Sequence, residues 1–230
     1  MPRLLAIGDV HGCSRALDAL LLAVGLEPDD RLVMLGDYVD RGPDSRGVLD
    51  RVIAMHTAGR VVALRGNHEL IMQSARSASE SVDFWLAVGG LATLASYSQS
   101  GRGGRLQDIP ERHWEFLESK CVDWYEQGAH FFVHAGVDPD LPLNAQPSTM
   151  LHWENVNEWT QPHQSGKTMI CGHSEQRSGW PLVQEHVICL DTCAYSGGWL
   201  TCLDVGSGRV WQASQYGKTR GGWIDEGSPR

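Results

Sequence analysis

Five short polar clusters interrupt the apolar runs of this sequence, and each contains side chains that bind metal ions. In the first, GDVHG (8–12), Asp9 and His11 stand two positions apart, directly after the apolar run 4–7. Side chains two positions apart on an extended chain point in the same direction, so this carboxylate and this imidazole can face one ion. The other clusters are GDYVDRG (36–42), RGNHE (65–69), VHAG (133–136) and CGH (171–173).

Together the clusters supply imidazole, carboxylate and amide ligands, a mixture that suits Mn, Fe or Zn better than Ca or Mg. Six ligands are too many for one tetrahedral zinc ion. We therefore predict two divalent ions that share a bridging carboxylate, with Asp37 as the bridge because it lies centrally in the expected sheet. The predicted ligands are Asp9 and His11 for one ion, Asn67, His134 and His173 for the other, and Asp37 for both.

This ligand set predicts the hydrolysis of phosphate esters. Two ions about 3.5–4 Å apart can hold a water molecule and lower its pKa from about 15.7 towards 7. The expected reaction is direct attack of this metal-bridging hydroxide on a phosphomonoester, without a phosphoenzyme. The leaving oxygen needs a proton, for which His68 is the candidate donor and Asp40 the residue that orients it. Arg41 and Arg65 lie next to the clusters and are expected to hold phosphate oxygens.

The first third of the chain predicts a parallel sheet that can bring these side chains together. Its three apolar runs are short and continuous, as in strands buried on both faces. A helix capped by Ser14 and ending at Gly25, and another that begins at 43–45, are expected to connect them. Residues at the carboxyl ends of neighbouring parallel strands meet in one crevice. The three expected strands are 4–7, 32–35 and 61–64.

After these strands the sequence pattern changes twice, first to helices and then back to strands. Residues 74–128 predict a helical insert, with helical pieces at 83–88 and 113–126 and a Ser/Gly/Arg-rich loop near 98–105. The second half returns to strands, and Gly206-Ser207-Gly208 predicts a hairpin between the last two. These strands are expected at 130–133, 168–171, 187–190, 200–204 and 210–213.

Composition and charge narrow the classes of function. The 230 residues are 42% hydrophobic and 20% charged, which is ordinary for a globular protein of one or two domains. We expect one domain over 1–215 and a loosely held polar tail over 216–230. The formal charge of −9 argues against a nucleic-acid partner. No apolar stretch approaches the roughly 20 residues of a membrane span, so no membrane partner is expected.

The six cysteines form no C-x-x-C pair, which indicates reduced thiols and a cytoplasmic protein. Residues 1–3 run directly into a strand followed by predicted ligands, so no cleavable signal is expected. CGHSEQR (171–177) fits the C-x5-R spacing of thiol-dependent phosphatases. We reject that interpretation because Glu175 would place a negative charge in the phosphate-binding loop, and His173 is already a predicted metal ligand.

In this order the five clusters resemble those of the metal-dependent phosphoprotein phosphatase family, and most closely its compact bacterial and phage serine/threonine members. The resemblance covers roughly residues 4–205 and includes GGLATLASY (89–97) and LDTCAYSGGWLTCLDV (190–205). It implies an α/β fold with a central β-sandwich of mixed sheets flanked by α-helices, as in calcineurin-like metallophosphoesterases. It also implies two metal ions, often manganese in bacterial members, and supports the pairing of His68 with Asp40.

The sequence departs from the family pattern at one position. Relatives usually have a further phosphate-binding arginine just after a tryptophan between the last two metal histidines. Here that stretch is Leu151-His152-Trp153-Glu154-Asn155. Either Arg177 or the loop with Arg102 and Arg105 supplies the contact, or the substrate preference differs.

We therefore predict a metal-dependent serine/threonine protein phosphatase that acts on a phosphorylated protein or peptide, with some activity on phosphotyrosine. The alternative is a hydrolase of dinucleoside tetraphosphates, which are small phosphoanhydrides. A non-catalytic phospho-binding scaffold is a third hypothesis. A scaffold would be expected to have lost some of the ligands, yet all six are present.

Overall fold

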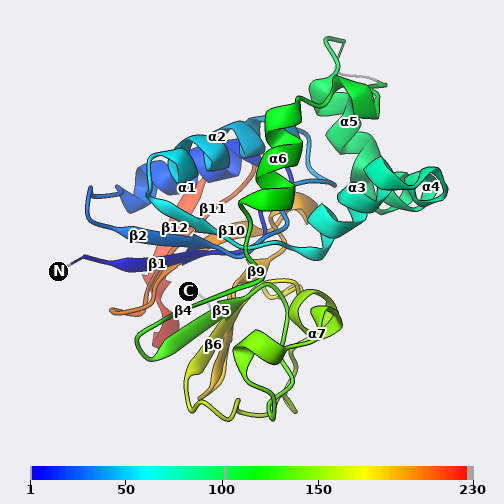
Figure 1. Ribbon diagram of the computed structural model, residues 1–230. Coiled ribbons are helices and arrows are strands. Elements are labelled where there is room, and N and C mark those ends of the chain that lie inside the picture. Colours follow the sequence, from blue (N-terminus) through cyan, green and yellow to red (C-terminus); the bar gives the residue numbers. More distant parts are fainter. Residues whose placement is uncertain (1, 101–102, 227–230) are drawn as a thin grey trace.

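Two β-sheets face each other in this protein, with helices on their outer faces (Figure 1). The computed structural model describes residues 2–100 and 103–226. The first sheet has the order β12 (Thr219–Trp223), β11 (Arg209–Ala213), β10 (Trp199–Asp204), β1 (Leu4–Ile7), β2 (Arg31–Met34) and β3 (Val61–Ala63), with β9 (Asp191–Thr192) paired to β10. The second has the order β4 (Trp124–Gln127), β5 (His130–Val133), β6 (Thr168–Cys171), β8 (Val187–Cys189) and β7 (Leu182–Val183). Each sheet contains parallel and antiparallel pairs, so the expected sandwich of mixed sheets is confirmed.

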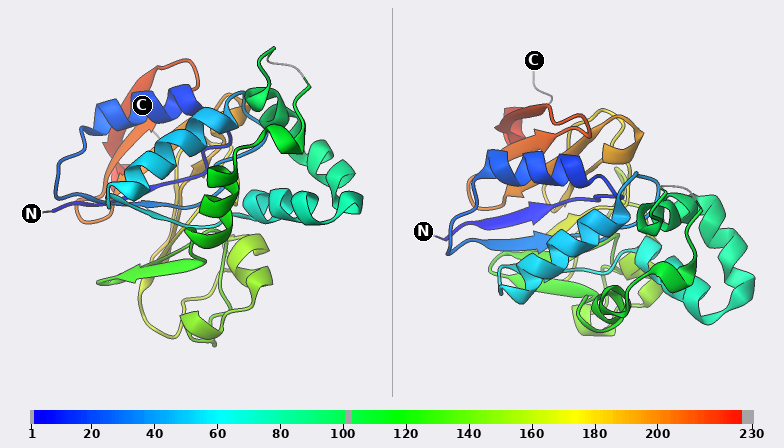
Figure 2. Two further views of the ribbon diagram at one scale, coloured as in Figure 1. Left: turned by 45° about the horizontal axis from the view of Figure 1, so that its top comes forward. Right: turned by 90° about the horizontal axis from the view of Figure 1, so that it is seen from above.

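The parallel strands β1, β2 and β3 form as predicted, with Leu4 paired to Arg31 and Leu32 to Val61. Two helices connect them, α1 (Ser14–Val24) and α2 (Ser45–Thr57), and Figure 2 shows both on the same face of the first sheet. This connectivity places the carboxyl ends of all three strands at one edge, where the polar clusters begin.

Both faces of β1 are buried, which explains its uninterrupted apolar run. Leu5 and Ile7 belong to the cluster beneath the helices, whereas Ala6 belongs to the cluster between the sheets. That second cluster joins Val33 of the first sheet to Phe132 of the second. Burying a Leu, Ile, Val or Phe side chain stabilises a fold by about 1.5–3 kcal/mol, so these contacts hold the sheets together.

Local chemistry sets the ends of the two connecting helices. Ser14 is the first residue of α1 rather than its cap, because the cap position is occupied by Cys13. The helix ends at Gly25, whose φ of 59° is left-handed and favours glycine. At α2 the Asp44 carboxylate accepts a hydrogen bond of 2.9 Å from the Gly47 amide, as an N-cap residue does.

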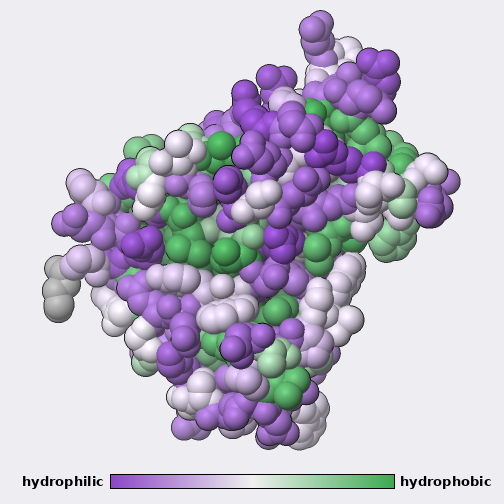
Figure 3. All heavy atoms as spheres, in the orientation of Figure 1, coloured by the Kyte–Doolittle hydropathy of each residue, from purple (hydrophilic) through white to green (hydrophobic). Residues whose placement is uncertain are grey.

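A helical segment lies between β3 and β4. Its elements are α3 (Asn67–Ser77), α4 (Val82–Trp85), a π-helical turn (Leu86–Gly90), α5 (Leu91–Tyr97) and α6 (Glu111–Ser119). It begins earlier than the predicted insert, because α3 follows β3 almost directly. Figure 3 shows apolar atoms gathered over part of this segment, and a second group of them over the region of α2 and β2. Phe84 and Leu91 of the helical segment are exposed.

Two expectations about the second half are wrong. Residues 124–126, expected to end the helical piece 113–126, lie instead in β4, which turns back at Gly128 (φ 61°) and pairs antiparallel with β5. Part of the expected loose tail is β12, which pairs with β11 from Thr219 to Trp223 and therefore belongs to the sheet. The other predicted strands and the 206–208 hairpin lie within a residue or two of their expected positions, whereas the short strands β7 and β9 were not predicted. In the described part of the chain, no helix is long and apolar enough to cross a membrane.

Candidate metal centre

The six predicted ligands converge where five strands of the two sheets end. Those from the first sheet follow β1, β2 and β3, and those from the second follow β5 and β6. Five of the six side chains are buried, and His173 is half-buried. The ligands of the first sheet are Asp9, His11, Asp37 and Asn67, and those of the second are His134 and His173.

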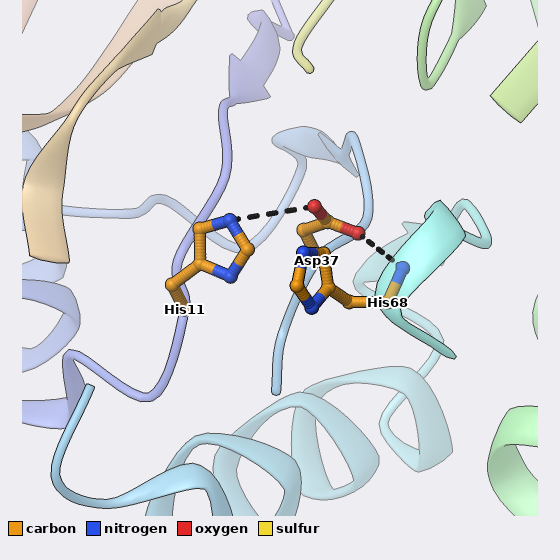
Figure 4. Close-up of side chains that lie close together, drawn as sticks. All are labelled: His11, Asp37 and His68. Atoms are coloured by element: carbon orange, nitrogen blue, oxygen red, sulfur yellow. Dashed lines mark hydrogen bonds and ion pairs between the residues drawn. The ribbon is translucent and has the colours of Figure 1, made fainter. Parts of the chain in front are cut away.

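Asp37 lies at the middle of this group. Its Oδ2 is 3.4 Å from His11 Nε2, and its Oδ1 is 3.6 Å from His134 Nε2. Figure 4 shows its carboxylate between the His11 ring and the backbone amide of His68, which donates to Oδ1 at 3.0 Å. The candidate ligand atoms form two sets, and the atoms of each set lie within 4.8 Å of one another. One set contains His11 and His68 and the other contains Asp9 and His134, while Asp37 belongs to both. This position fits a bridging carboxylate, although by distance Asp9 groups with His134 rather than with His11.

Two of the imidazoles are oriented for metal binding by the backbone. His11 Nδ1 donates to the Val39 carbonyl at 2.9 Å, and His134 Nδ1 donates to the Leu35 carbonyl at 2.8 Å. Each Nε2 lone pair is thereby directed at Asp37, which is the orientation of metal-bound histidines with a backbone partner. Burial lowers the pKa of His11 to about 3 and that of His134 to about 4, so both rings are neutral.

Asn67 adds an amide to the same group. Its Oδ1 faces His134 Nε2 at 3.0 Å, and both atoms carry lone pairs. Either a cation between them satisfies this contact, or the amide turns so that its nitrogen donates to His134 and Asp37. In the first case the amide oxygen is within reach of an ion that His134 also binds.

A third buried carboxylate, which the sequence analysis did not identify, lies near this group. Asp191 Oδ1 accepts a hydrogen bond from the Cys193 amide at 3.0 Å, and Oδ2 has no hydrogen-bond partner. Burial raises the pKa of Asp191 to about 7, and burial together with Asp191 and Asp37 raises that of Asp9 well above its usual value. Three buried carboxylates at close range favour bound cations, so the donor set fits two divalent ions. The only signal for Asp191 was its place in the LDT of the 190–205 stretch.

The backbone of these loops is strained in a consistent way. Six non-glycine residues in the described part of the chain have left-handed φ values, and five of them lie in the polar clusters. Such conformations cost about 1–3 kcal/mol each and persist where the surroundings fix them. The five are His11 (43°), Asp37 (48°), Asp40 (70°), Arg41 (66°) and His173 (60°).

Glu69 fixes one of these loops, a role that the sequence analysis missed. Its carboxylate accepts hydrogen bonds of 2.8 Å from the amides of Asp37, Tyr38 and Gly66. It thereby joins the loop after β2 to the start of α3. Gly66 has no side chain because a Cβ there would overlap the Asp37 carboxylate.

His68 and Asp40 form the predicted pair. His68 Nδ1 lies 2.8 Å from Asp40 Oδ2, and the Asp40 carboxylate is fully buried. Two residues of the helical segment complete its hydrogen bonds, Thr93 Oγ1 at 2.7 Å and Trp85 Nε1 at 3.0 Å. Burial acts to lower the pKa of His68, but Asp37 and Asp40 together raise it above its ordinary value. The ring is thus stabilised in its protonated form beside the ligand group.

Thr93 is expected to be necessary for the strength of this pair. Replacing Thr93 with valine keeps the shape but removes the hydroxyl from a buried carboxylate, which should lower the free energy of unfolding by about 1–3 kcal/mol. Turnover should also fall, since Asp40 would orient His68 less firmly. Chemical denaturation and steady-state kinetics measure the two effects. Thr93→Ser, which keeps the hydroxyl, is the control and should retain most of both.

The two predicted phosphate-binding arginines lie in different surroundings. Arg41 Nη1 is 3.1 Å from His11 Nε2 and therefore borders the ligand group. Arg65 instead pairs with Asp123 and donates to the carbonyls of Glu118 and Cys121 near the end of α6. The structure thus gives Arg65 an anchoring contact to α6, and none of these partners is a predicted ligand.

The residues that could replace the missing phosphate-binding arginine also differ in their contacts. Arg177 Nη2 lies 3.4 Å from Glu175 Oε2, and Glu175 in turn contacts Arg41. Arg105 pairs with Asp108 at 3.2 Å. Arg102 lies outside the described residues. Of the described candidates, only Arg177 is connected to the ligand group through a shared partner.

The thiols are arranged as expected for structural residues. All six cysteines are free and buried. Cys171 is fully buried in β6, where its backbone pairs with Cys189 of β8. A hydrogen bond to Cys189 and, after it, burial raise the pKa of the Cys171 thiol well above its usual value. A thiolate nucleophile needs the opposite shift.

Removing the Cys171 thiol should therefore leave catalysis intact. Cys171→Ala is expected to keep turnover of p-nitrophenyl phosphate within about threefold of the original chain, with a small loss of stability from the lost volume. The measurement is kcat under saturating metal. A loss of turnover in a folded, metal-loaded variant would instead support a phosphatase that uses the Cys171 thiol as its nucleophile.

Comparison with known proteins agrees with this geometry. A family model described as calcineurin-like phosphoesterase matches residues 2–183. The chain is 30% identical over 210 residues to serine/threonine-protein phosphatase 1 of Salmonella typhimurium, covering 85% of this chain and 88% of that protein. It is 36% identical over 141 residues to a symmetrical bis(5'-nucleosyl)-tetraphosphatase of Ralstonia nicotianae, covering 58% of this chain and 42% of that protein. The alignment therefore spans less than half the length of the tetraphosphatase.

Solved structures share the same fold. The crystal structure of a protein provisionally described as a diadenosine tetraphosphatase matches with a TM-score of 0.65 and 24% identity, covering 97% of this chain and 96% of that one. A cold-active protein-tyrosine phosphatase of a Shewanella species matches with a TM-score of 0.62 and 16% identity, covering 96% and 80%. At these identities the likeness concerns the fold alone.

Proposed function

The chain belongs to the calcineurin-like phosphoesterase family of hydrolases, and on this premise we propose that it is a metal-dependent serine/threonine protein phosphatase. The observation that carries the proposal is the buried hydrogen bond of 2.8 Å between His68 and Asp40. A serine or threonine alkoxide is a poor leaving group and needs a proton, whereas a phosphate released from an anhydride depends on one much less. A protonated imidazole beside the ligand group is therefore most useful for alkyl phosphomonoesters.

The chain's own residues have separate tasks in this reaction. Arg41 would hold phosphate oxygens through its guanidinium. His68 would give the Nε2 proton to the leaving oxygen, while Asp40 keeps Nδ1 hydrogen-bonded and the ring aligned. When bound, two divalent ions would polarise a water molecule and the phosphoryl group. The residues that would hold them are Asp9, His11, Asp37, Asn67, His134 and His173.

The proposal includes the metal and the compartment. Imidazole and oxygen ligands together favour manganese, with iron and zinc as alternatives. Six free, buried thiols are typical of a reducing compartment, so we place the protein in the cytoplasm. Metal analysis of the purified protein and fractionation of cells test these two points.

The substrate class is tested by comparing two substrates under the same manganese concentration. A phosphothreonine peptide should be hydrolysed with a higher kcat/KM than diadenosine tetraphosphate. A phosphotyrosine peptide should also be hydrolysed, since a phenoxide leaves more readily than an alkoxide. A clear preference for the dinucleotide would overturn the proposal in favour of the second candidate.

That second candidate is hydrolysis of a dinucleoside tetraphosphate. It is favoured by the 36% identity to the Ralstonia nicotianae tetraphosphatase, which is higher than the identity to the protein phosphatase, although over a shorter segment. The absence of an arginine in 151–155 also leaves the phosphate contacts incomplete relative to the expected pattern. A non-catalytic scaffold is disfavoured, because the family is one of hydrolases and the ligand group is complete.

A further inference from the structure

A polar cavity of about 540 Å³ lies between residues 175–179 and the turn before β10. Tyr195 connects it to the metal centre, because the Tyr195 ring lies 5.1 Å from the His11 ring. Glu175 and Arg177 are the two charged residues among the described residues that line it. A substrate that extends beyond Arg41 in this direction would therefore meet one carboxylate and one guanidinium.

The Glu175 carboxylate is held between two arginines. Its Oε1 lies 3.4 Å from Arg41 Nη1, and its Oε2 lies 3.4 Å from Arg177 Nη2. The Tyr195 hydroxyl donates to Oε1 at 2.6 Å, and the Arg41 guanidinium stacks over the same tyrosine ring at 4.7 Å. Three partners fix the carboxylate, so it does not turn away freely when an anion approaches.

This arrangement places the negative charge of Glu175 close to the metal-ligand group. Arg41 contacts Glu175 and the ligand His11 with the same nitrogen, so only one guanidinium group separates the carboxylate from the ligand group. Arg177 has a side chain that is 87% exposed and would otherwise offer a free positive charge. Glu175 offsets that charge and adds its own repulsion for further phosphate groups.

We propose that Glu175 is a specificity-determining residue that disfavours substrates with a second phosphoryl group beside the reacting one. It would act as a repulsive element that selects phosphomonoesters over phosphoanhydrides, since specificity often depends on penalising the wrong substrate. The inference rests on the proposed function, because it explains why a chain with anhydride-hydrolysing relatives would act on phosphorylated proteins.

The test is the ratio of kcat/KM for diadenosine tetraphosphate to kcat/KM for a phosphothreonine peptide. Glu175→Gln removes the charge but keeps the size and the oxygen that accepts from Tyr195. We expect it to raise this ratio about tenfold at low salt, as removing one unit charge within several ångströms of a polyphosphate should do. The increase should shrink at high ionic strength, which a purely structural effect would not do.

Two further variants keep the test decisive. Arg177→Gln, at a side chain too exposed to affect folding, should lower the ratio because it removes the charge that partly neutralises Glu175. Glu185→Gln makes the same substitution before β8, at the opposite end of that sheet from the ligands, and should leave the ratio unchanged. A ratio that does not move in Glu175→Gln, or that moves equally in Glu185→Gln, would overturn the inference. The proposed function fails separately, if the original chain itself prefers the dinucleotide.

Discussion

Replacing His68 with asparagine is expected to lower turnover of a phosphothreonine peptide by about 10²–10⁴-fold, the usual contribution of a general acid. Asparagine keeps a polar side chain of similar reach but has no proton to give at neutral pH. The leaving alkoxide must then be protonated by water. Steady-state kcat at saturating manganese measures the effect.

The leaving group makes this prediction specific. With p-nitrophenyl phosphate the leaving phenoxide is stable without a proton, so His68→Asn should lower kcat far less than it does with the peptide. Metal content per chain should stay the same, because His68 Nδ1 is committed to Asp40 and the ring is not among the six proposed ligands. Equal losses on both substrates, or a loss of metal, would instead make His68 a ligand, which its place within 4.8 Å of His11 and Asp37 would permit.

Replacing Asp37 with asparagine is expected to have a comparably large effect on turnover. Asp37 is the one residue common to both groups of ligand atoms, and it is 2% exposed. Outer-shell partners of metal ligands typically contribute 10–100-fold, so a bridging ligand should contribute at least about 10³-fold to turnover. The variant should also bind fewer ions per chain, which elemental analysis after dialysis would show.

A matched carboxylate serves as the control for Asp37. Asp30 is also buried, but it pairs with Arg3 at 2.5 Å, near the opposite end of β1. Asp30→Asn should lower stability while leaving two ions per chain and near-normal turnover. If both variants lost metal to the same extent, the loss would reflect general destabilisation rather than the bridge.

Most ligands could be predicted from the sequence because each stands directly after a buried strand. Asp9, Asp37 and His134 interrupt apolar runs abruptly, and parallel connections force such positions to one edge. Asp191 also follows an apolar run, 187–190, but its neighbours Leu190 and Thr192 include no glycine and no metal-binding side chain, so no polar cluster marks it. Only the folded chain shows that its carboxylate is buried near Asp9.

Arg65 is the opposite case, a residue that the sequence predicted for the site but whose side chain contacts other groups. Its position in RGNHE suggested a phosphate contact, but a side chain as long as that of arginine can turn towards either end of its loop. The carbonyls near the end of α6 and the carboxylate of Asp123 lie within its reach and accept its hydrogen bonds. Likewise, Trp124 and Tyr125 lie in β4 because β5 provides an antiparallel partner across Gly128. Helical spacing over a few residues cannot reveal such a partner.

The ligands come from both sheets, so bound ions tie the two halves of the sandwich to each other. Each ion that binds only the folded chain would stabilise it by about 4 kcal/mol when present at a thousand times its dissociation constant. A chain that relies on such ties unfolds more often when the ion is scarce, and unfolded chains are the ones that cellular proteases remove. We therefore expect the amount of this protein in a growing culture, and not only its activity, to follow the metal content of the medium.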